Sequence, residues 1–310
     1  MTNIAAIDCG TNSIRLLISK VEDDGSLSEI TRRMIIVRLG EGVDATGKFS
    51  EAALARVFVA CDEYAQLIKT YQVEHIRFIA TSATRDVSNR EEFANGVRSR
   101  LNCELEVISG DTEAELSFAG AIEELAQNLT GPYLVLDIGG GSTEFVLGTS
   151  KPEYAKSVNI GCVRMTERHL NQDPPSNEAV ESAIKDIDDA IELAAKTVPL
   201  DKAVTVIGLA GSVTTVAAMA LGLDKYDRNA IHACVVSKDS VAKCAERLLQ
   251  MTREQRAALP YMHPGRVDVI GAGALVLDRI VKKLNVDSIV VSEHDILDGI
   301  ALSIAAKIKA

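Results

Sequence analysis

Short apolar runs separated by polar turns dominate the first part of the chain and are typical of strands. The predicted strands cover residues 4–9, 14–21, 28–39, 75–82 and 105–109. Elsewhere in this part apolar residues recur on one helical face, which predicts helices. The predicted helices cover a segment that begins after the N-cap Ser50, then about 90–101 and 112–126. Strands followed by alternating helices and strands indicate an α/β domain.

The same order of elements begins again after Gly131 and Pro132. The predicted strands here cover residues 133–139, 143–149, 154–160, 203–210, 232–237 and 288–293. The predicted helices cover about 176–196, a segment that begins near 211, and about 296–310. This weak internal duplication predicts two similar α/β domains, residues 1–127 and 128–295, that face each other across a central cleft. The last helix is a candidate to pack back on the first domain.

Composition narrows the class of protein. The chain has 310 residues, of which 47% are hydrophobic and 25% charged, as in ordinary globular proteins. The net charge of −11 argues against a broad basic surface for nucleic acid, although arginines, backbone amides and a bound cation can still form a polyanion site. No run approaches the roughly 18 apolar residues of a membrane helix. The first residues run directly into a strand, so we expect no signal peptide and a cytoplasmic protein.

Several common catalytic patterns are missing from the sequence. It contains no G-x-x-x-x-G-K-[ST] loop, which excludes P-loop nucleotide hydrolases. It also contains no G-x-S-x-G elbow, which argues against a serine hydrolase. The five histidines have no H-x-x-x-H or H-E-x-x-H spacing, so no zinc site is expected. The six cysteines are scattered without a C-x-x-C pair, which favours buried, reduced thiols.

One strand-to-turn device occurs twice. Residues 4–13 read IAAIDCGTNS and residues 134–144 read LVLDIGGGSTE, so Asp8 and Asp137 each end an apolar run before a glycine. At the mouth of a sheet, glycine permits close backbone approach, consecutive amides can bind an anion, and hydroxyls add donors. The carboxylates repel phosphate and are better placed to hold a divalent cation or a water. A single such turn is usually structural, but two in corresponding places favour a phosphate site shared between two domains.

Six stretches of the chain, taken in order, carry a resemblance to a known family. They read AIDCGTNSIRLLI, ATSATRDVSN, VISGDTEAELSF, VLDIGGGSTEF, VIGLAGSVTTVAA and HPGRVDVIGAGALVL. Together they resemble successive motifs of the exopolyphosphatase / guanosine pentaphosphate phosphohydrolase family, from residue 4 to about 300. That family belongs to the superfamily of actin, sugar kinases and heat-shock ATPases. The resemblance therefore implies two actin-like (ribonuclease H-like) domains and hydrolysis of phosphoanhydride bonds.

The resemblance also implies roles for individual residues. Glu113 matches the catalytic base, with Glu115 as its nearby rival. Asp137 and Glu144 match the acidic pair of the second phosphate motif, which supports the attacking water or a Mg²⁺ ion, and Asp8 is their counterpart in the first domain. Mn²⁺ is an alternative metal. The positions expected to bind phosphates are Thr11, Asn12, Ser13, Arg85, Gly139, Gly140, Gly141 and Ser142.

The chain departs from the longer family members, because it stops where they continue into a helical C-terminal domain. The resemblance therefore does not carry over the processive handling of long polymers. It suggests a homodimer, with no nucleic-acid or membrane partner.

Each of these assignments has a plainer alternative. Glu113 at the start of a helix also complements the helix dipole. Arg85, expected in a loop, could pair with Asp86 or Glu91. For Gly208 to Gly211, where the superfamily binds a nucleoside, we favour close helix packing. Five further arginines could guide a polyanion, although each is expected to be a solvated surface charge: Arg32, Arg33, Arg38, Arg164 and Arg266.

The sequence thus predicts a cytoplasmic exopolyphosphatase in which Glu113 activates a water that attacks the terminal phosphate of inorganic polyphosphate. The first alternative is hydrolysis of guanosine pentaphosphate at its 5′ end. A kinase or ATPase of the superfamily and a non-catalytic alarmone-binding regulator are the others. The presence of Asp8, Glu113, Asp137 and Glu144 together argues against a decayed site.

Overall fold

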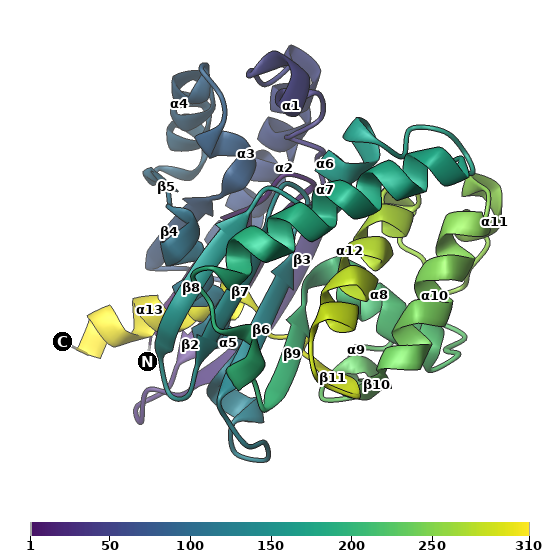
Figure 1. Cartoon of the computed structure of the whole chain (residues 1–310). Coiled ribbons are helices and arrows are strands. Elements are labelled where there is room, and N and C mark those ends of the chain that lie inside the picture. The colour runs from purple at the N-terminus through teal and green to yellow at the C-terminus, as the bar shows by residue number, and fades with distance from the viewer. Residues whose placement is uncertain (1, 310) are drawn as a thin grey trace. The chain divides into compact units, whose positions relative to one another are not determined.

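The computed structural model describes residues 2–309 and divides into two compact units (Figure 1). The first comprises the residues up to Gly120 together with those from Ile296 onward, and the second comprises Ala121–Asp295. The sequence placed the boundary at 127–128, whereas the units divide inside the helix α5 (Gly110–Leu125). A continuous helix crosses the boundary, so there is no change of composition at this point for the sequence to reveal.

The first unit is a five-stranded mixed sheet covered by helices. Its strands are β1 (Thr2–Cys9), β2 (Ser13–Val21), β3 (Leu27–Ile36), β4 (His75–Ala80) and β5 (Leu105–Val107). Its helices are α1 (Val43–Thr46), α2 (Glu51–Thr70), α3 (Ser82–Arg85), α4 (Arg90–Leu101), the greater part of α5, and α13 (Ile296–Lys309). The strand order is β3-β2-β1-β4-β5, with antiparallel pairing on the β2 side of β1 and parallel pairing on the β4 side.

Alternation along β1 divides the first unit's core into two layers. Ala5 and Ile7 face a cluster that includes the apolar side of α2, whereas Ile4 and Ala6 face the C-terminal helix α13. This is the period-2 placement of side chains expected of a strand buried on both faces. Helix α13, yellow in Figure 1, contacts β1, β2, β3 and β4. The C-terminal helix therefore belongs to the core of the first unit.

The second unit repeats this topology around a six-stranded sheet. Its strands are β6 (Tyr133–Ile138), β7 (Thr143–Gly148), β8 (Pro152–Val158), β9 (Thr205–Leu209), β10 (Val235–Ser237) and β11 (Ser288–Val291). Its helices are α6 (Cys162–Arg168), α7 (Asn177–Ala195), α8 (Ala210–Ala220), α9 (Arg228–Ile231), α10 (Lys238–Gln250), α11 (Arg253–Ala257) and α12 (Ile270–Lys283), with short 3-10 turns at Leu200–Lys202 and Pro264–Arg266. The order β8-β7-β6-β9-β11 matches β3-β2-β1-β4-β5, with β10 added antiparallel to β11. The internal duplication predicted from the sequence is therefore present.

Helix α12 organises the core of the second unit. It contacts α6, α7, α8 and α10, and almost its whole length is buried, in keeping with its run of small and aliphatic residues. Figure 1 shows the long helix α7 and helix α10 beside α12 within this unit.

Most predicted helices and strands are present, with local differences. Ser50 caps α2 as expected, because its side chain accepts a hydrogen bond from the N–H of Ala53. The loop expected around Arg85 is the short helix α3, and helix α6 was not predicted. The strand expected over 232–237 is shorter, because Ala233 has a left-handed φ of 60° and β10 begins only at Val235. No helix within residues 2–309 has the length and hydropathy required to cross a bilayer.

Candidate active site

The first glycine turn, between β1 and β2, is fixed by backbone hydrogen bonds. The N–H of Gly10 donates to the carbonyl of Ser13 at 3.0 Å. The carbonyl of Asn12 accepts from the N–H groups of Val37 and Arg38, and that of Thr11 accepts from Gly40. The Thr11 hydroxyl lies 3.1 Å from the hydroxyl of Ser82, the first residue of α3. The turn is therefore attached both to the segment after β3 and to α3.

The second glycine turn, between β6 and β7, repeats this geometry. The N–H of Gly139 donates to the carbonyl of Ser142 at 3.0 Å, as Gly10 does to Ser13. The carbonyls of Gly139 and Gly140 accept hydrogen bonds from the first N–H groups of α6, and the carbonyl of Gly141 accepts one from the Arg164 side chain at 2.8 Å. Three consecutive carbonyls are thus held by one helix.

This arrangement determines where the amides of the second turn point. In a planar trans peptide the N–H lies opposite the preceding carbonyl. Because the carbonyls of Gly139, Gly140 and Gly141 point toward α6, the N–H groups of Gly140, Gly141 and Ser142 point away from it. Backbone N–H groups of a turn can bind an anion when they face the same ligand. Phosphate binding at this turn stays a prediction.

Strand register places a carboxylate pair beside the second turn. Asp137 of β6 lies directly opposite Glu144 of β7, so both side chains are on the same face of the sheet. Both are buried, with 7% and 1% of their surfaces exposed. Oε1 of Glu144 accepts hydrogen bonds from the hydroxyls of Ser142 and Ser157, each at 2.7 Å. The Ser142 hydroxyl hydrogen is therefore committed to Glu144.

In the first unit the equivalent register position carries the opposite charge. Asp8 lies opposite Arg15, whose side chain donates to Oδ2 of Asp8 at 3.0 and 2.6 Å. The duplicated hairpins thus differ, with a neutralised pair in one and two carboxylates in the other. Since Mg²⁺ prefers several oxygen ligands of negative charge, the donor set of Asp137 and Glu144 fits this ion better than that of Asp8.

Glu113 and Arg85 form an ion pair inside the first unit. Glu113 lies in the first turn of α5 and is 8% exposed. Nη1 of Arg85, the last residue of α3, is 2.8 Å from Oε2 of Glu113 and also donates to the carbonyl of Ile108. Arg85 therefore pairs with the predicted base rather than with Asp86 or Glu91. The sequence alone does not indicate this ion pair. Glu115, the rival of Glu113, is exposed.

Arg164 is not the solvated surface charge that was expected. It is 9% exposed, and its Nε holds the carbonyl of Gly141. Just before it, Gly161 lies so close to the glycine turn that a Cβ there would be 2.3 Å from the carbonyl carbon and oxygen of Gly140. Arg164 and Gly161 thus position the turn, and no local sequence pattern predicts either role.

The segment from Gly208 to Gly211 serves close packing, as the sequence favoured. A Cβ on Gly208 would lie 2.7 Å from the side chain of Val213, and one on Gly211 would overlap the guanidinium of Arg266. Arg266 donates to the carbonyl of Gly211 at 3.2 Å and approaches the Thr215 hydroxyl at 3.3 Å. This arginine, too, is held within the second unit.

The cysteines do not supply an ionised nucleophile. Burial raises the pKa of each of the six thiols: Cys9, Cys61, Cys103, Cys162, Cys234 and Cys244. For Cys61 the pKa rises to about 12 and for Cys103 to about 11. A cysteine-dependent phosphatase needs a thiolate near neutral pH. The raised pKa values therefore argue against a thiolate nucleophile.

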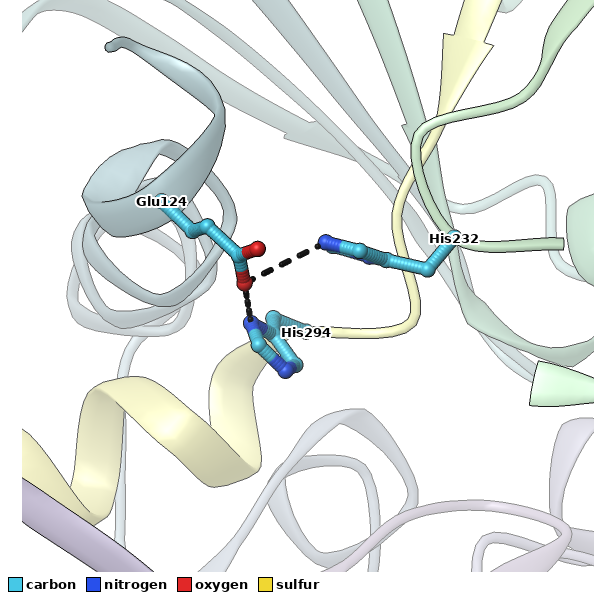
Figure 2. Close-up of side chains that lie close together, drawn as sticks. All are labelled: Glu124, His232 and His294. Carbon is cyan, nitrogen blue, oxygen red and sulfur yellow. Dashed lines mark ion pairs between the residues drawn. The ribbon is translucent and has the colours of Figure 1, made fainter. Parts of the chain in front are cut away.

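The structure also assembles a cluster that local motifs could not reveal. Glu124, His232 and His294 come from distant parts of the sequence and place their ligand atoms within 4.8 Å of one another (Figure 2). The pKa of His232 is lowered by burial and by the neighbouring His294, and the Glu124 carboxylate opposes this shift. The spacing of the histidines predicted no zinc site, because such motifs contain only ligands that lie close together in the sequence.

Comparisons with known proteins agree with this architecture. The sequence model of the Ppx/GppA phosphatase family matches residues 17–308. The chain is 48% identical to Exopolyphosphatase 2 of Mycobacterium tuberculosis over 317 aligned residues, covering 98% of this chain and 99% of that protein. The crystal structure of an exopolyphosphatase-like protein matches with a TM-score of 0.95 at 42% identity over 99% of this chain and 100% of that one.

A more distant structure leads to the same conclusion. The crystal structure of the Aquifex aeolicus member of the Ppx/GppA family matches with a TM-score of 0.80 at 29% identity, covering 100% of this chain and 99% of the other. These matches confirm the two-domain α/β fold that the resemblance implied. The chain belongs to the Ppx/GppA phosphatase family and is a hydrolase.

Proposed function

We propose that the protein is an exopolyphosphatase that hydrolyses the terminal phosphoanhydride bond of inorganic polyphosphate and releases orthophosphate. The observation that carries this proposal is the second glycine turn, whose N–H groups point away from α6 and which joins the strands of the buried pair Asp137 and Glu144. The likeness to Exopolyphosphatase 2 supports the choice of polyphosphate, because the two chains are similar over nearly their full lengths.

Backbone amides suit a polymeric phosphate substrate. Every phosphoryl group along such a chain presents equivalent oxygens, so a site built from the N–H groups of Gly140, Gly141 and Ser142 needs no base or sugar for recognition. Thr11, Asn12 and Ser13 are proposed to contribute in the same way from the first unit's turn. A site of this kind distinguishes substrates by their charge and by the length of their phosphate chain.

We propose Glu113 as the general base. It would accept a proton from the attacking water as the bond to the terminal phosphorus forms and the bond to the bridging oxygen breaks, leaving orthophosphate and a shortened polyphosphate. Arg85 holds the Glu113 carboxylate at 2.8 Å and thereby fixes its orientation. A guanidinium fork can also bind phosphate oxygens, so the incoming substrate competes with Glu113 for Arg85.

Asp137 and Glu144 are the residues proposed to hold Mg²⁺, or Mn²⁺ in its place. Two adjacent carboxylates are a suitable oxygen donor set, and Ser142 and Ser157 orient one of them. When bound, the ion would neutralise charge on the phosphoryl oxygens. Asp8 is proposed mainly to position Arg15, because its Oδ2 accepts hydrogen bonds from Nε and Nη2 of that side chain.

The test is phosphate release from separate incubations with short polyphosphate, long polyphosphate, guanosine pentaphosphate and ATP in the presence of Mg²⁺. We expect polyphosphate to give the highest kcat/KM. Glu113→Gln keeps the shape of the side chain but removes the base, and should lower kcat by about 10²–10⁴-fold. The matched control is Glu115→Gln, an exposed residue on the same helix, which should leave kcat unchanged.

Each alternative predicts a different result. Faster hydrolysis of guanosine pentaphosphate would replace the substrate assignment while leaving the chemistry intact. Turnover of ATP only with an acceptor would indicate a kinase, and tight binding of guanosine tetraphosphate without turnover would indicate a regulator. Full activity of Glu113→Gln would refute its role as the base.

A further inference from the structure

A carboxylate and two imidazoles meet in the second unit, apart from the residues assigned above (Figure 2). Glu124 lies in the last turn of α5, His232 directly follows α9, and His294 lies between β11 and α13. Oε2 of Glu124 is 3.4 Å from Nε2 of His232 and 3.6 Å from Nδ1 of His294. We propose that these three side chains form a binding site for one divalent transition-metal ion, with Zn²⁺ as the best match.

The separation of the ligand atoms fits such an ion. Metal–ligand bonds of 2.0–2.1 Å in a tetrahedral site place neighbouring ligand atoms about 3.3 Å apart. The two distances from Glu124 are 3.4 and 3.6 Å, and the two imidazole nitrogens lie within 4.8 Å of each other, so the three ligand atoms are within reach of one ion. Two imidazole nitrogens and one carboxylate oxygen select zinc and its neighbours over Mg²⁺ or Ca²⁺, which require oxygen ligands. Three protein ligands leave a further position for water.

The two histidines are held in place by the backbone. The N–H of Ala233 donates to the carbonyl of Val291, and the N–H of Val291 donates to the carbonyl of Cys234. The N–H of His294 donates to the Ser292 hydroxyl at 3.0 Å. The two rings lie one beside the other, with centroids 4.7 Å apart. Glu124, whose side chain is 59% exposed, can rotate when the ion enters from solvent.

One nitrogen of the cluster has an unmet requirement. Nε2 of His232 is buried and makes no hydrogen bond among residues 2–309; its contact with Glu124 at 3.4 Å is an ion pair. Leaving a buried polar atom without a hydrogen bond is unfavourable. A metal ion at this point would satisfy the nitrogen and neutralise the nearby carboxylate.

Metal binding would also break one hydrogen bond of His232, and the loss of this bond can be detected. Nδ1 of His232 accepts a hydrogen bond from the N–H of Glu293 at 3.2 Å. An imidazole that binds a metal through Nε2 carries its proton on Nδ1, so this hydrogen bond must break. We therefore expect weaker binding than at structural zinc sites of four protein ligands. The amide resonance of Glu293 should shift when the ion binds.

The location of the cluster indicates what the ion would do. The chain passes from the first unit to the second at Gly120 and Ala121, and returns at Asp295 and Ile296. Glu124 follows the first passage and His294 precedes the second. An ion bound by both would clamp the two segments that connect the units. This role is independent of the proposed substrate.

Zinc titration into chelator-treated protein, with Mg²⁺ in excess to fill oxygen-ligand sites, tests the proposal. Calorimetry should give one Zn²⁺ per chain, and Co²⁺ should give an absorption spectrum typical of nitrogen and oxygen ligands. A metal concentration 100 times the Kd should raise Tm by about 5–10 °C. Glu124→Gln, His232→Gln and His294→Gln should each weaken binding at least about tenfold.

The matched control is His75→Gln, an exposed histidine of β4, which should bind zinc like the wild type. Unchanged binding in the three cluster variants, or no saturable binding by the wild type, would overturn the proposal and leave an ordinary ion-paired cluster. If His232→Gln does not fold, Glu124→Gln decides, because its side chain is exposed and isosteric. Phosphate release plays no part in these measurements, so they stand whether or not the proposed activity is found.

Discussion

Replacing Gly161 with alanine tests whether the N-terminus of α6 positions the second glycine turn. The added Cβ would lie 2.3 Å from the carbonyl carbon and oxygen of Gly140 and 2.5 Å from the nitrogen of Gly141. Ordinary contact begins at 3.4 Å, so the turn and the helix must separate by 3.4 − 2.3 = 1.1 Å. Gly161 has φ −108° and ψ 163°, which alanine adopts without strain, so the effect is purely steric.

The size of the effect follows from this displacement. Overpacking of a closely fitted site costs about 1–3 kcal/mol. For a unit of this size, each kcal/mol lowers Tm by about 2–4 °C. If the amides of Gly140, Gly141 and Ser142 bind the substrate, a shift of about 1 Å should lower kcat/KM roughly 100-fold.

Thermal unfolding and phosphate release measured on the same preparation separate the two consequences. The control is Gly271→Ala in α12, where the nearest atom to the new Cβ is 3.6 Å away, so both stability and activity should be retained. An unchanged Tm would refute the contact. A lowered Tm with unchanged kcat/KM would show that the turn does not bind substrate.

Two further changes test other parts of the structure. Gly299→Ala would place a Cβ 2.0 Å from the backbone oxygen of Leu116, where α13 crosses α5, and should destabilise the protein by about 1–3 kcal/mol in urea unfolding; a loss no greater than that of Gly271→Ala would show that this crossing is loose. Burial, and then Arg266, lowers the pKa of His263 below its ordinary 6.5. The unfolded chain therefore binds more protons, and this group's contribution to stability is complete above pH 6.5 and lost as the pH falls through the folded-state pKa. His263→Asn should lose less stability than the wild type between pH 7 and 5, and equal slopes in the two proteins would contradict the assignment.

The sequence was sufficient for the features that depend on local pattern. The apolar runs predicted the strands, and the repeated Asp-x-Gly turn predicted the duplication. Such features follow from residues that are close together along the chain, where hydrogen-bond and side-chain periodicities act directly.

Features that depend on distant residues were not predictable. The sequence predicts Arg164 to be a surface charge, because nothing in it indicates that Gly141 lies beside this side chain. The partner of Arg85 is Glu113, 28 residues away, rather than a neighbour in the sequence. His232 and His294 fit no metal motif, because strand β11 rather than local spacing brings their segments together. In each case the deciding fact is a long-range contact, which one sequence without relatives does not encode in its local pattern.

The place of α13 has a consequence for synthesis on the ribosome. The sheet of the first unit is made early, yet the helix that covers Ile4, Ala6, Leu17 and Val21 begins only at Ile296, 296 − 120 = 176 residues after Gly120. At typical elongation rates the ribosome needs about 10–35 s for that distance. Throughout this interval α13 has not been synthesised, and the apolar side of the sheet that packs against it is not covered. The first unit is therefore begun first and completed last.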